Sequence, residues 1–385
     1  SIQDALEMLP LEEDLGEDET GVIILAETTA EGKVHDIYDT IVITRGKVTI
    51  QGTRNSEIRA HTPGKDIFAI PHENPDPGED WNNMPTLYNI LFKDFKVTST
   101  YTYSKDCATV HAYNVDNLTV EGLIDESAVY RFVQIHLPYS GGPSISGGSN
   151  NIFIKKNNVS RGIKVGYSKN VYVADNIGIN VDVNRNLEYV YVTGNHFTAD
   201  EHNSVIRLHG GRYVWVTDNI LEGGANAILN DGISDIVMEN NIMRNNYYSD
   251  RGYNCGIVLT PQYKISNVMI RNNRIYNNFG SGIYTKDYGE RASEFNTTLD
   301  VINNVIYNNT DGGILMGDEK IALNIINNII TNNVNYGINY MNTTIEATTI
   351  KYNDVWNNGI DTDGDGSGDD NYNDISSGIG DISAN

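Results

Sequence analysis

The chain has 385 residues, a formal net charge of −24 at pH 7 and a sequence pI near 4.6. This acidity disfavours nucleic acid and anionic membrane surfaces as partners. No apolar run reaches the roughly 20 residues that a membrane-spanning helix needs, and no signal peptide begins the chain. We therefore expect a soluble protein, secreted or at a cell surface, that works as a monomer and does not insert into membranes.

The first part of the chain predicts a cap and a set of irregular strands. Residues 1–9, SIQDALEML, predict a short amphipathic helix that begins at Ser1. Helices often cover the open end of a stack of β-strands, where an exposed strand edge would invite aggregation. We expect residues 1–20 to form this cap. Strands are predicted next at 22–25, 40–44, 48–51 and 57–60, and again at 91–97 and 118–123.

From residue 151 to 358 the chain repeats one pattern, in which alternating apolar residues lead to a pair of asparagines. The second asparagines of the copies lie 18 to 32 residues apart. A fixed strand unit with a loop of variable length, repeated at this spacing, indicates a solenoid. The aligned asparagines are Asn158, Asn176, Asn195, Asn219, Asn241, Asn273, Asn304, Asn328 and Asn353.

The repeated units are predicted to be strands, because Val and Ile alternate with polar residues at a period of two. At a tight corner, Asn tolerates a left-handed backbone, and its amide can bond the Asn one coil away. The predicted fold class is all-β: a single right-handed parallel β-helix over residues 1–358, with a ladder of asparagines and a short N-terminal capping helix.

Residues 359–385 form an Asp- and Gly-rich tail that contains DTDGDG. Asp361, Asp363 and Asp365 match the first half of a calcium loop, although position twelve is Tyr372 rather than Glu. A solvated linker is the alternative. No cofactor is required by any motif, so calcium is the one candidate ion. The cysteines, Cys107 and Cys255, are expected about six coils apart, too far for a disulfide.

In a β-helix, outward residues of successive coils form a column with a spacing of about 4.8 Å. The outward positions of one strand are unusually ionisable between residues 111 and 231. A basic column on so acidic a chain predicts a binding surface, and a polar outer face with coincidental charges is the alternative. The column comprises His111, Gln134, His136, Lys164, Asn180, Asp182, Arg207, His209, Asn230 or Asp231, Tyr284 and Lys286, with Tyr139 on a neighbouring loop.

Such a column suits the cleavage of an acidic polysaccharide. Cations can pair with a uronate carboxylate and acidify the neighbouring C5 proton, which a base then removes to eliminate the 4-linked sugar. Hydrolysis is the close alternative. It would use Asp182 and Asp231, which are expected roughly 9–10 Å apart, near the inverting separation of about 6.5–9.5 Å. The candidate catalytic residues are Asp182, Arg207, His209, Lys164, His136 and Asp231, and the others are candidates for substrate binding.

The asparagine ladder and its V-x-I-x-N-N-x-I repeats resemble the pectate-lyase-like superfamily of carbohydrate-active β-helix proteins. The stretch 204–223, SVIRLHGGRYVWVTDNILEG, is similar to part of alginate and chondroitin lyases, where an Arg-His-Gly run precedes V-x-x-N-x-F-x-G. The resemblance implies that Arg207 is an acid or a carboxylate partner, although Leu208 is inserted in the run. The NDVWNN and GDIS segments near the C-terminus resemble secreted archaeal β-helix proteins, including enzymes that degrade a chondroitin-like matrix.

The sequence thus predicts a secreted, endo-acting depolymerase of an acidic, uronic-acid-containing heteropolysaccharide, working in a groove along one strand face. A polysaccharide lyase is slightly favoured over a glycoside hydrolase. A non-catalytic surface or adhesin module that binds glycan, and a calcium-stabilised scaffold without a ligand, are the other hypotheses.

Overall fold

The protein is described by a computed structural model. It describes the whole chain except residues 11–15, 17–19, 26–33, 71–85, 102–106, 136–147, 201, 248–252, 261–265, 287–296, 318–320, 341–347, 360–370, 374–379 and 383–385.

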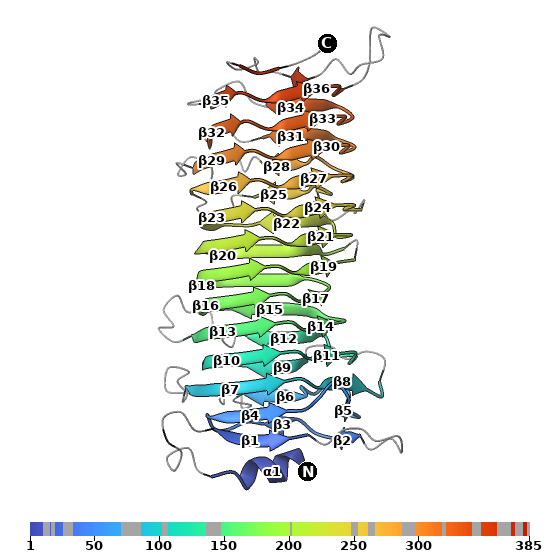
Figure 1. Cartoon of the computed structure of the whole chain (residues 1–385), viewed down its shortest axis with the longest axis vertical. Helices are drawn as coiled ribbons and strands as arrows, with labels where there is room; N and C mark the ends of the chain where they lie inside the picture. The colour runs from blue at the N-terminus through green and yellow to red at the C-terminus, as the bar shows by residue number, and fades with distance from the viewer. Residues whose placement is uncertain are drawn as a thin grey trace. The chain divides into compact units, whose positions relative to one another are not determined.

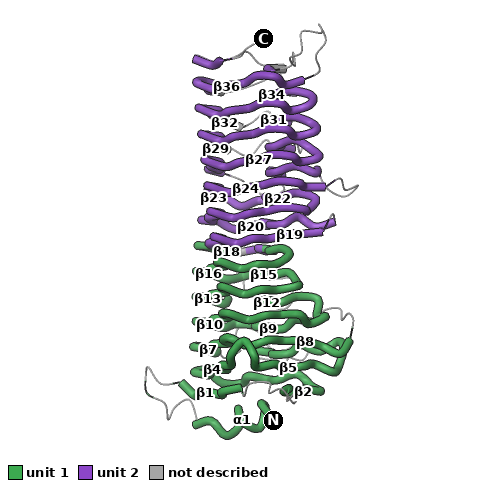
Figure 2. The backbone as a smooth tube through the Cα atoms, turned by 45° about the vertical axis from the view of Figure 1, so that its right-hand side comes forward, with its two compact units in different colours: residues 1–182, 186–190 green, residues 183–185, 191–385 purple. Residues whose placement is uncertain are grey.

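The chain divides into two compact units, which Figure 2 shows in green and purple. Unit 1 comprises residues 1–182 and 186–190, and unit 2 comprises residues 183–185 and 191–385. One long strand, β18 (Val181–Thr193), contributes residues to both. Each unit is built from the same kind of coil and is described by itself.

Unit 1 begins with the helix at the blue end of Figure 1 and continues with short strands. Its elements are α1 (Ile2–Glu7), β1 (Gly21–Ile24), β2 (His35–Ile37), β3 (Ile41–Val42), β4 (Val48–Gln51), β5 (Glu57–Ala60), β6 (Phe68–Ile70), β7 (Leu87–Lys93), β8 (Lys96–Ser99), β9 (Ala108–Ala112), β10 (Val115–Glu121), β11 (Ile124–Asp125), β12 (Arg131–Ile135), β13 (Ser149–Lys155), β14 (Asn158–Val159), β15 (Gly162–Gly166), β16 (Ser168–Ala174) and β17 (Ile177–Gly178).

Strands are the regular elements that the structure describes in unit 2. They are β19 (His196–Thr198), β20 (Ser204–Thr217), β21 (Ile220–Glu222), β22 (Asn226–Asn230), β23 (Ile233–Glu239), β24 (Ile242–Arg244), β25 (Ile257–Leu259), β26 (Val268–Arg271), β27 (Arg274–Tyr276), β28 (Ile283–Thr285), β29 (Thr297–Ile302), β30 (Val305–Tyr307), β31 (Gly312–Met316), β32 (Ile321–Ile326), β33 (Ile329–Thr331), β34 (Tyr336–Tyr340), β35 (Thr348–Lys351), β36 (Asp354–Trp356) and β37 (Tyr372–Asn373).

Within each unit, a strand pairs in parallel with its equivalents one coil before and one coil after. In unit 1, Leu118 of β10 lies between Ile90 of β7 and Ile152 of β13, and all three side chains are buried. In unit 2, Ile236 of β23 pairs with Val268 of β26 in the same way. Because inward positions stack on inward positions, the Val, Ile and Leu side chains form a continuous core along each unit. The expected parallel β-helix is confirmed.

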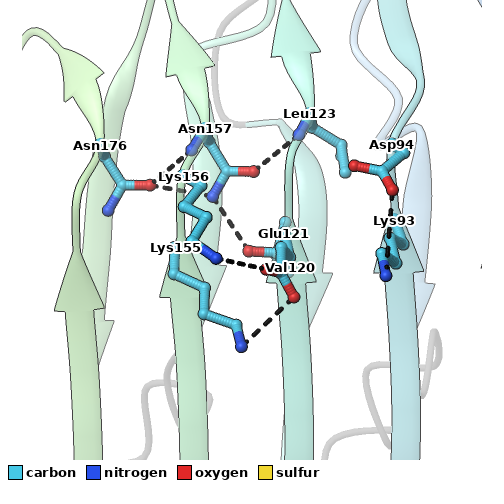
Figure 3. A network of polar contacts seen from close by, with 9 residues as sticks. All are labelled: Lys93, Asp94, Val120, Glu121, Leu123, Lys155, Lys156, Asn157 and Asn176. Carbon is cyan, nitrogen blue, oxygen red and sulfur yellow. Dashed lines mark hydrogen bonds and ion pairs between the residues drawn. The ribbon is translucent and has the colours of Figure 1, made fainter. Parts of the chain in front are cut away.

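The asparagine ladder is present in both units. In unit 1, the side chain of Asn157 donates to the Oδ1 atom of Asn176 at 2.9 Å and to the carbonyl of Val120, and it accepts from the backbone of Leu123 (Figure 3). In unit 2 the same bonds link Asn195, Asn219, Asn241, Asn273, Asn304, Asn328 and Asn353.

The structure corrects one member of the predicted ladder. The rung is Asn157, which is 1% exposed, whereas Asn158 is exposed and begins β14. The reason is that the left-handed backbone position is taken by Lys156 (φ 57°). In several later copies this position is the first residue of an asparagine pair, such as Asn240 or Asn272, and the second residue forms the rung. The sequence analysis gave both the left-handed backbone and the ladder hydrogen bonds to one asparagine, but in the structure they belong to two successive residues.

A second ladder was not predicted, although its asparagines end each clear copy of the repeat. The side chain of Asn278 donates to Asn309 at 2.9 Å, and Asn309 donates to Asn333 at 2.9 Å. The rungs from Asn246 to Asn358 again follow a left-handed residue, such as Asn277 before Asn278. The complete run is Asn246, Asn278, Asn309, Asn333, Asn358 and Asn371.

The N-terminal helix is confirmed and is shorter than the predicted segment. Its first turn is closed by a capping box, in which the Ser1 hydroxyl accepts from the backbone of Asp4 and the Asp4 carboxylate accepts from the Ser1 amino group. Ile2 and Leu6 are buried against the first coils. Cys107 and Cys255 are both buried and free, as expected. None of the described helices has the length and apolarity needed to cross a membrane.

Candidate functional site

Three of the candidate catalytic residues lie together in unit 2. Arg207 and His209 occupy alternate positions of β20, and Asp231 directly follows β22. The register places Leu208 beside Asn230, and the backbone amide of Asp231 donates to the carbonyl of Leu208 at 2.7 Å. Asp231 therefore stands next to His209 on the following coil. The sequence left open whether Asn230 or Asp231 faces outward, and this register decides for Asp231.

Asn230 holds the turn that positions Asp231. Its side chain is fully buried, and its Oδ1 atom accepts from the backbone amides of Gly232 and Ile233 at 3.0 and 2.7 Å. Gly232 has a φ of 132°, a conformation that side chains rarely adopt. The expectation that Asn230 contacts substrate is thus corrected: its amide is used within the fold and faces the core side of the strand, in register with Leu208.

Asp231 is the centre of the cluster. Its Oδ2 atom accepts from the Nε and Nη2 atoms of Arg207 at 3.3 and 3.2 Å and lies 3.7 Å from the Nδ1 atom of His209. Its Oδ1 atom accepts a hydrogen bond from the hydroxyl of Thr260. Burial of a carboxylate is costly unless it is paired and hydrogen-bonded, and these partners meet that need. We call Arg207, His209, Asp231 and Thr260 the Asp231 cluster.

The cluster has a graded exposure that matters for chemistry. The side chain of Asp231 is 4% exposed, that of His209 is 14% exposed and that of Arg207 is 50% exposed. A buried carboxylate thus accepts two hydrogen bonds from a solvent-facing guanidinium, and an imidazole nitrogen lies 3.7 Å from it. An arginine fork presented in this way can bind a carboxylate.

Further along unit 2, an aromatic and cationic group continues the same two columns. Tyr284 of β28 and Lys286 follow the positions of Arg207 and His209, respectively, on a later coil. The Nζ atom of Lys286 donates to the Tyr253 hydroxyl at 2.6 Å, and the rings of Tyr253 and Tyr284 are 5.3 Å apart. Tyr284 and Lys286 were expected substrate contacts, and the structure places them beside each other.

Unit 1 contains a second group of the expected residues. The pairings of β9, β12 and β15 place His111, Gln134 and Lys164 on three successive coils. The Nδ1 atom of His111 lies 2.8 Å from the Oδ2 atom of Asp66, and its Nε2 atom lies 3.3 Å from the Nε2 atom of Gln134. We call Asp66 and His111 the Asp66 dyad.

The Asp66 dyad is closed in by its neighbours. Asp66 also accepts from the backbone of Ala108 at 2.7 Å, and the ring of Tyr113 lies 4.6 Å from that of His111. Burial, helped by the charge of Asp66, raises the pKa of Tyr113 to about 12, so its hydroxyl stays protonated. Asp66 was missed by sequence reasoning, because it lies on the turn before β6 and belongs to no repeated pattern.

The remaining expected residues are placed as follows. Asp182 lies at the start of β18 in unit 1, partly exposed, and its Oδ1 atom is buried without a hydrogen-bond partner among the described residues. Asn180, also in unit 1, is 8% exposed, and its carbonyl accepts from Ile163. The expectations that concern His136, Tyr139, Asp361, Asp363 and Asp365 lie outside the described residues.

Comparison with known proteins identifies the fold. Residues 177–355 match the family model described as "Right handed beta helix region", which gives the handedness of the coil. No curated protein sequence matches the chain. Among solved structures, tailspike protein 3 of bacteriophage CBA120 aligns with a TM-score of 0.59 at 11% identity, covering 91% of this chain and 57% of the tailspike.

Two other similar structures align over most of their length. The surface protein and adhesin PfbA of Streptococcus pneumoniae aligns with a TM-score of 0.53 at 13% identity, covering 98% of this chain and 95% of PfbA. A mutant of the periplasmic alginate epimerase AlgG aligns with a TM-score of 0.53 at 13% identity, covering 100% of this chain and 82% of AlgG. At these identities the likeness concerns the fold, and the chain has the right-handed parallel β-helix fold that its sequence predicts.

Proposed function

We propose that this protein is a secreted depolymerase of an acidic, uronic-acid-containing polysaccharide, and that it cleaves its substrate by β-elimination at the Asp231 cluster. The observation that carries the proposal is the meeting of a solvent-facing guanidinium and an imidazole on one buried carboxylate. β-Elimination of a uronide needs a cation on the sugar carboxylate and a base at the adjacent C5 hydrogen. Arg207 and His209 supply these two groups on one strand.

In the proposed reaction, Arg207 binds the uronate carboxylate and stabilises the charge that develops there when the C5 proton leaves. His209 takes that proton, and Asp231 stabilises the resulting imidazolium. The electron pair of the C5–H bond forms the C4=C5 double bond, and the C4–O bond breaks. The departing glycosidic oxygen takes up a proton, which the imidazolium of His209 returns when both groups lie on the same face of the sugar.

Hydrolysis is the less well supported reaction. It requires two carboxylates that reach the glycosidic bond, one as acid and one as base or nucleophile. Asp231 is 4% exposed and already accepts bonds from Arg207 and Thr260. A carboxylate held in this way is suited to orienting its neighbours rather than to contacting a sugar. This is the reason for preferring elimination over the hydrolytic role that the sequence left open for Asp182 and Asp231.

The proposed site of action is outside the cell, where long acidic polysaccharides occur. Two similar folds belong to proteins described as a surface adhesin and as a periplasmic alginate epimerase, which is consistent with such a location and substrate. A glycan-binding protein without turnover is the second candidate function, favoured by the half-exposed guanidinium of Arg207, which can bind a carboxylate without any reaction. Calcium binding by the tail remains a separate prediction.

The test is incubation with a panel of uronic-acid polymers, following near-ultraviolet absorbance and reducing ends together. Elimination produces both signals, because each cleavage creates an unsaturated uronide, which absorbs, and a new reducing end. Arg207→Ala should abolish both, whereas Arg271→Ala should not. Arg271 is the matched control, because it is similarly exposed and is ion-paired to Glu239 at 2.8 Å in the same unit. Reducing ends without absorbance would identify a hydrolase, and binding without either signal would identify a glycan-binding module.

A further inference from the structure

The side chain of Asp231 is held between two neighbouring coils of unit 2. Asp231 stands in register with His209 on the preceding coil and with Thr260, which directly follows β25, on the next coil. The backbone amide of Asp231 donates to the carbonyl of Leu208 at 2.7 Å, and that of Thr260 donates to the carbonyl of Asn230 at 2.8 Å. The backbone therefore fixes His209, Asp231 and Thr260 as three successive members of one column.

The two carboxylate oxygens of Asp231 have partners on different coils. On the preceding coil, Oδ2 accepts from the Nε and Nη2 atoms of Arg207 at 3.3 and 3.2 Å and lies 3.7 Å from the Nδ1 atom of His209. On the next coil, Oδ1 accepts from the hydroxyl of Thr260. A rotation of the carboxylate moves both oxygens together, so the bond to Thr260 also restrains the oxygen that lies beside Arg207 and His209.

The bond from Thr260 is suited to this restraint. A threonine hydroxyl has one proton to donate, and the carbonyl of Asn230 lies 3.3 Å away as a second acceptor. The carboxylate is the stronger acceptor, because hydrogen bonds to an ionised group are stronger than those between neutral groups. The exposed fractions of Asp231 and Thr260 are 3% and 1%, so solvent has little access to replace this bond if it is lost.

We propose that Thr260 is a positioning residue for catalysis: by holding the Oδ1 atom of Asp231, it keeps the Oδ2 atom beside Arg207 and His209 in the geometry that proton abstraction needs. The proposal rests on the proposed function, in which Asp231 stabilises the imidazolium of His209. Thr260 is buried and acts on the reaction only through Asp231 and its two partners.

The test compares Thr260→Val, which keeps the shape of the side chain without its hydroxyl, with Thr260→Ser, which keeps the hydroxyl. Thr260→Val should lower kcat and kcat/KM by the same factor, about 10- to 100-fold, because it misplaces a group that acts in the transition state. Thr260→Ser should retain most of the activity. In a His209→Ala background, Thr260→Val should change kcat by less than about twofold, since the residue through which it acts is gone.

The control is Thr285→Val in the same unit. Thr285 is also fully buried, but its hydroxyl contacts Met316 and accepts from the backbone of Gly317 rather than from any member of the Asp231 cluster. This variant should leave kcat unchanged. If Thr260→Val does not fold, Thr260→Ala and Thr260→Ser, which differ only in the hydroxyl, supply the same comparison.

A second readout does not depend on turnover. In NMR spectra of protein with isotope-labelled histidine Cε1 groups, the His209 signal is identified by its loss in His209→Ala. It should move in Thr260→Val and keep its parent position in Thr260→Ser and Thr285→Val. An unmoved His209 signal, an equal effect of Thr285→Val, or additive losses of kcat for Thr260→Val and His209→Ala would overturn the positioning role. A moved signal without turnover on any polymer would reject the lyase and retain the restraint of Asp231 by Thr260.

Discussion

The two units each pair a histidine with an aspartate, and they use the pair differently. In unit 1 the Asp66 dyad is tight, at 2.8 Å, and the His111 side chain is 9% exposed and enclosed by Tyr113 and Gln134. The nearest expected cation of that column, Lys164, is two coils from His111. In unit 2 a single carboxylate, Asp231, is ion-paired to Arg207 at 3.2 Å and lies 3.7 Å from the imidazole of His209.

Because of this difference, the Asp66 dyad and the Asp231 cluster are suited to different tasks. Proton abstraction beside a sugar carboxylate requires the cation and the base to reach the same sugar, because both act on adjacent carbon atoms. The Asp231 cluster brings a guanidinium and an imidazole to one carboxylate, whereas the partners that the structure gives for Asp66 are His111 and the backbone of Ala108, with no cation among them. We therefore expect the Asp231 cluster to carry the catalysis and the Asp66 dyad to carry none of it.

The comparison is tested most strongly by replacing the two histidines in turn. His209→Ala should lower the rate of cleavage by about 10²- to 10⁴-fold, the usual contribution of a general base. His111→Ala should lower it by less than about tenfold and act through KM, as expected for a residue that only binds. Steady-state kinetics on the best polymer of the panel measures both. A larger loss of kcat for His111→Ala would transfer the chemistry to unit 1.

The next largest effect is expected from replacing the two cations, Arg207 and Lys164, in turn. Arg207→Ala should reduce kcat about 10²- to 10³-fold, because it removes a donor that stabilises the developing charge. Lys164→Ala should mainly raise KM. Thermal unfolding of Lys164→Ala should match the parent protein, whereas Arg207→Ala should unfold at a lower temperature, because the buried Asp231 carboxylate loses its paired cation. If the two variants lost the same factor in kcat, the division between the units would be wrong.

The ladders should govern stability rather than activity. Asn273→Ala should destabilise unit 2 by about 3 kcal/mol, because Asn241, Asn304 and the carbonyl of Met238 lose buried partners together. Asn324→Ala, which removes one partly exposed bond to Asp300, should cost less than about 1 kcal/mol. Denaturant unfolding followed by circular dichroism measures both. Similar losses for the two variants would show that the ladder contributes no more than a surface contact.

Unit 1 should carry a pH dependence through Asp125, which is 1% exposed. Burial raises the pKa of Asp125 to about 6, against hydrogen bonds from Ser127 and Thr109. The pKa of Asp125 in the folded protein lies above its unfolded value of about 3.9. The contribution of Asp125 to the free energy of unfolding is therefore largest below pH 4. It is lost as the pH rises through 6, by about 3 kcal/mol.

Asp125→Asn should remove this dependence, because the amide resembles the protonated carboxyl group. Glu57, Glu121 and Glu222 have lowered pKa values and act in the opposite direction, so the parent and the variant must be compared at each pH. The measurement is the urea midpoint between pH 4 and 7. Parallel curves for the two proteins would contradict the prediction.

The smallest effect concerns the residue before the rung, which varies between coils. In one coil of unit 1 this left-handed position is Lys156, whereas two coils of unit 2 have Asn240 and Asn272 there. Lys156→Asn should stabilise the protein by about 1 kcal/mol or less, since Asn tolerates this conformation better than Lys. The loss of an exposed ion pair with Glu121 reduces the gain. A clear decrease in thermal stability would show that this ion pair outweighs the backbone preference.

The sequence by itself determined the repeat, the strands, the main ladder and the helix that begins at Ser1. These features depend on local periodicity and on the properties of single residues: alternating apolar side chains, the tolerance of Asn for tight corners and the capping hydroxyl of Ser1. The column of Arg207 and His209 could also be found, because alternate residues of a strand share a face.

The tertiary structure decided what depends on register between coils. The alignment of asparagine pairs predicted Asn158 as the ladder residue. The structure has Asn157 there instead, because Lys156 takes the left-handed position before it. The hydrogen bonds of the Asn230 side chain fix the turn that places Asp231 beside Arg207. Asp66 reaches His111 across 45 residues of chain. Loops of variable length join the coils. The residues that meet across coils are therefore set by the hydrogen-bonded pairing of strands, which cannot be predicted from the spacing along the chain.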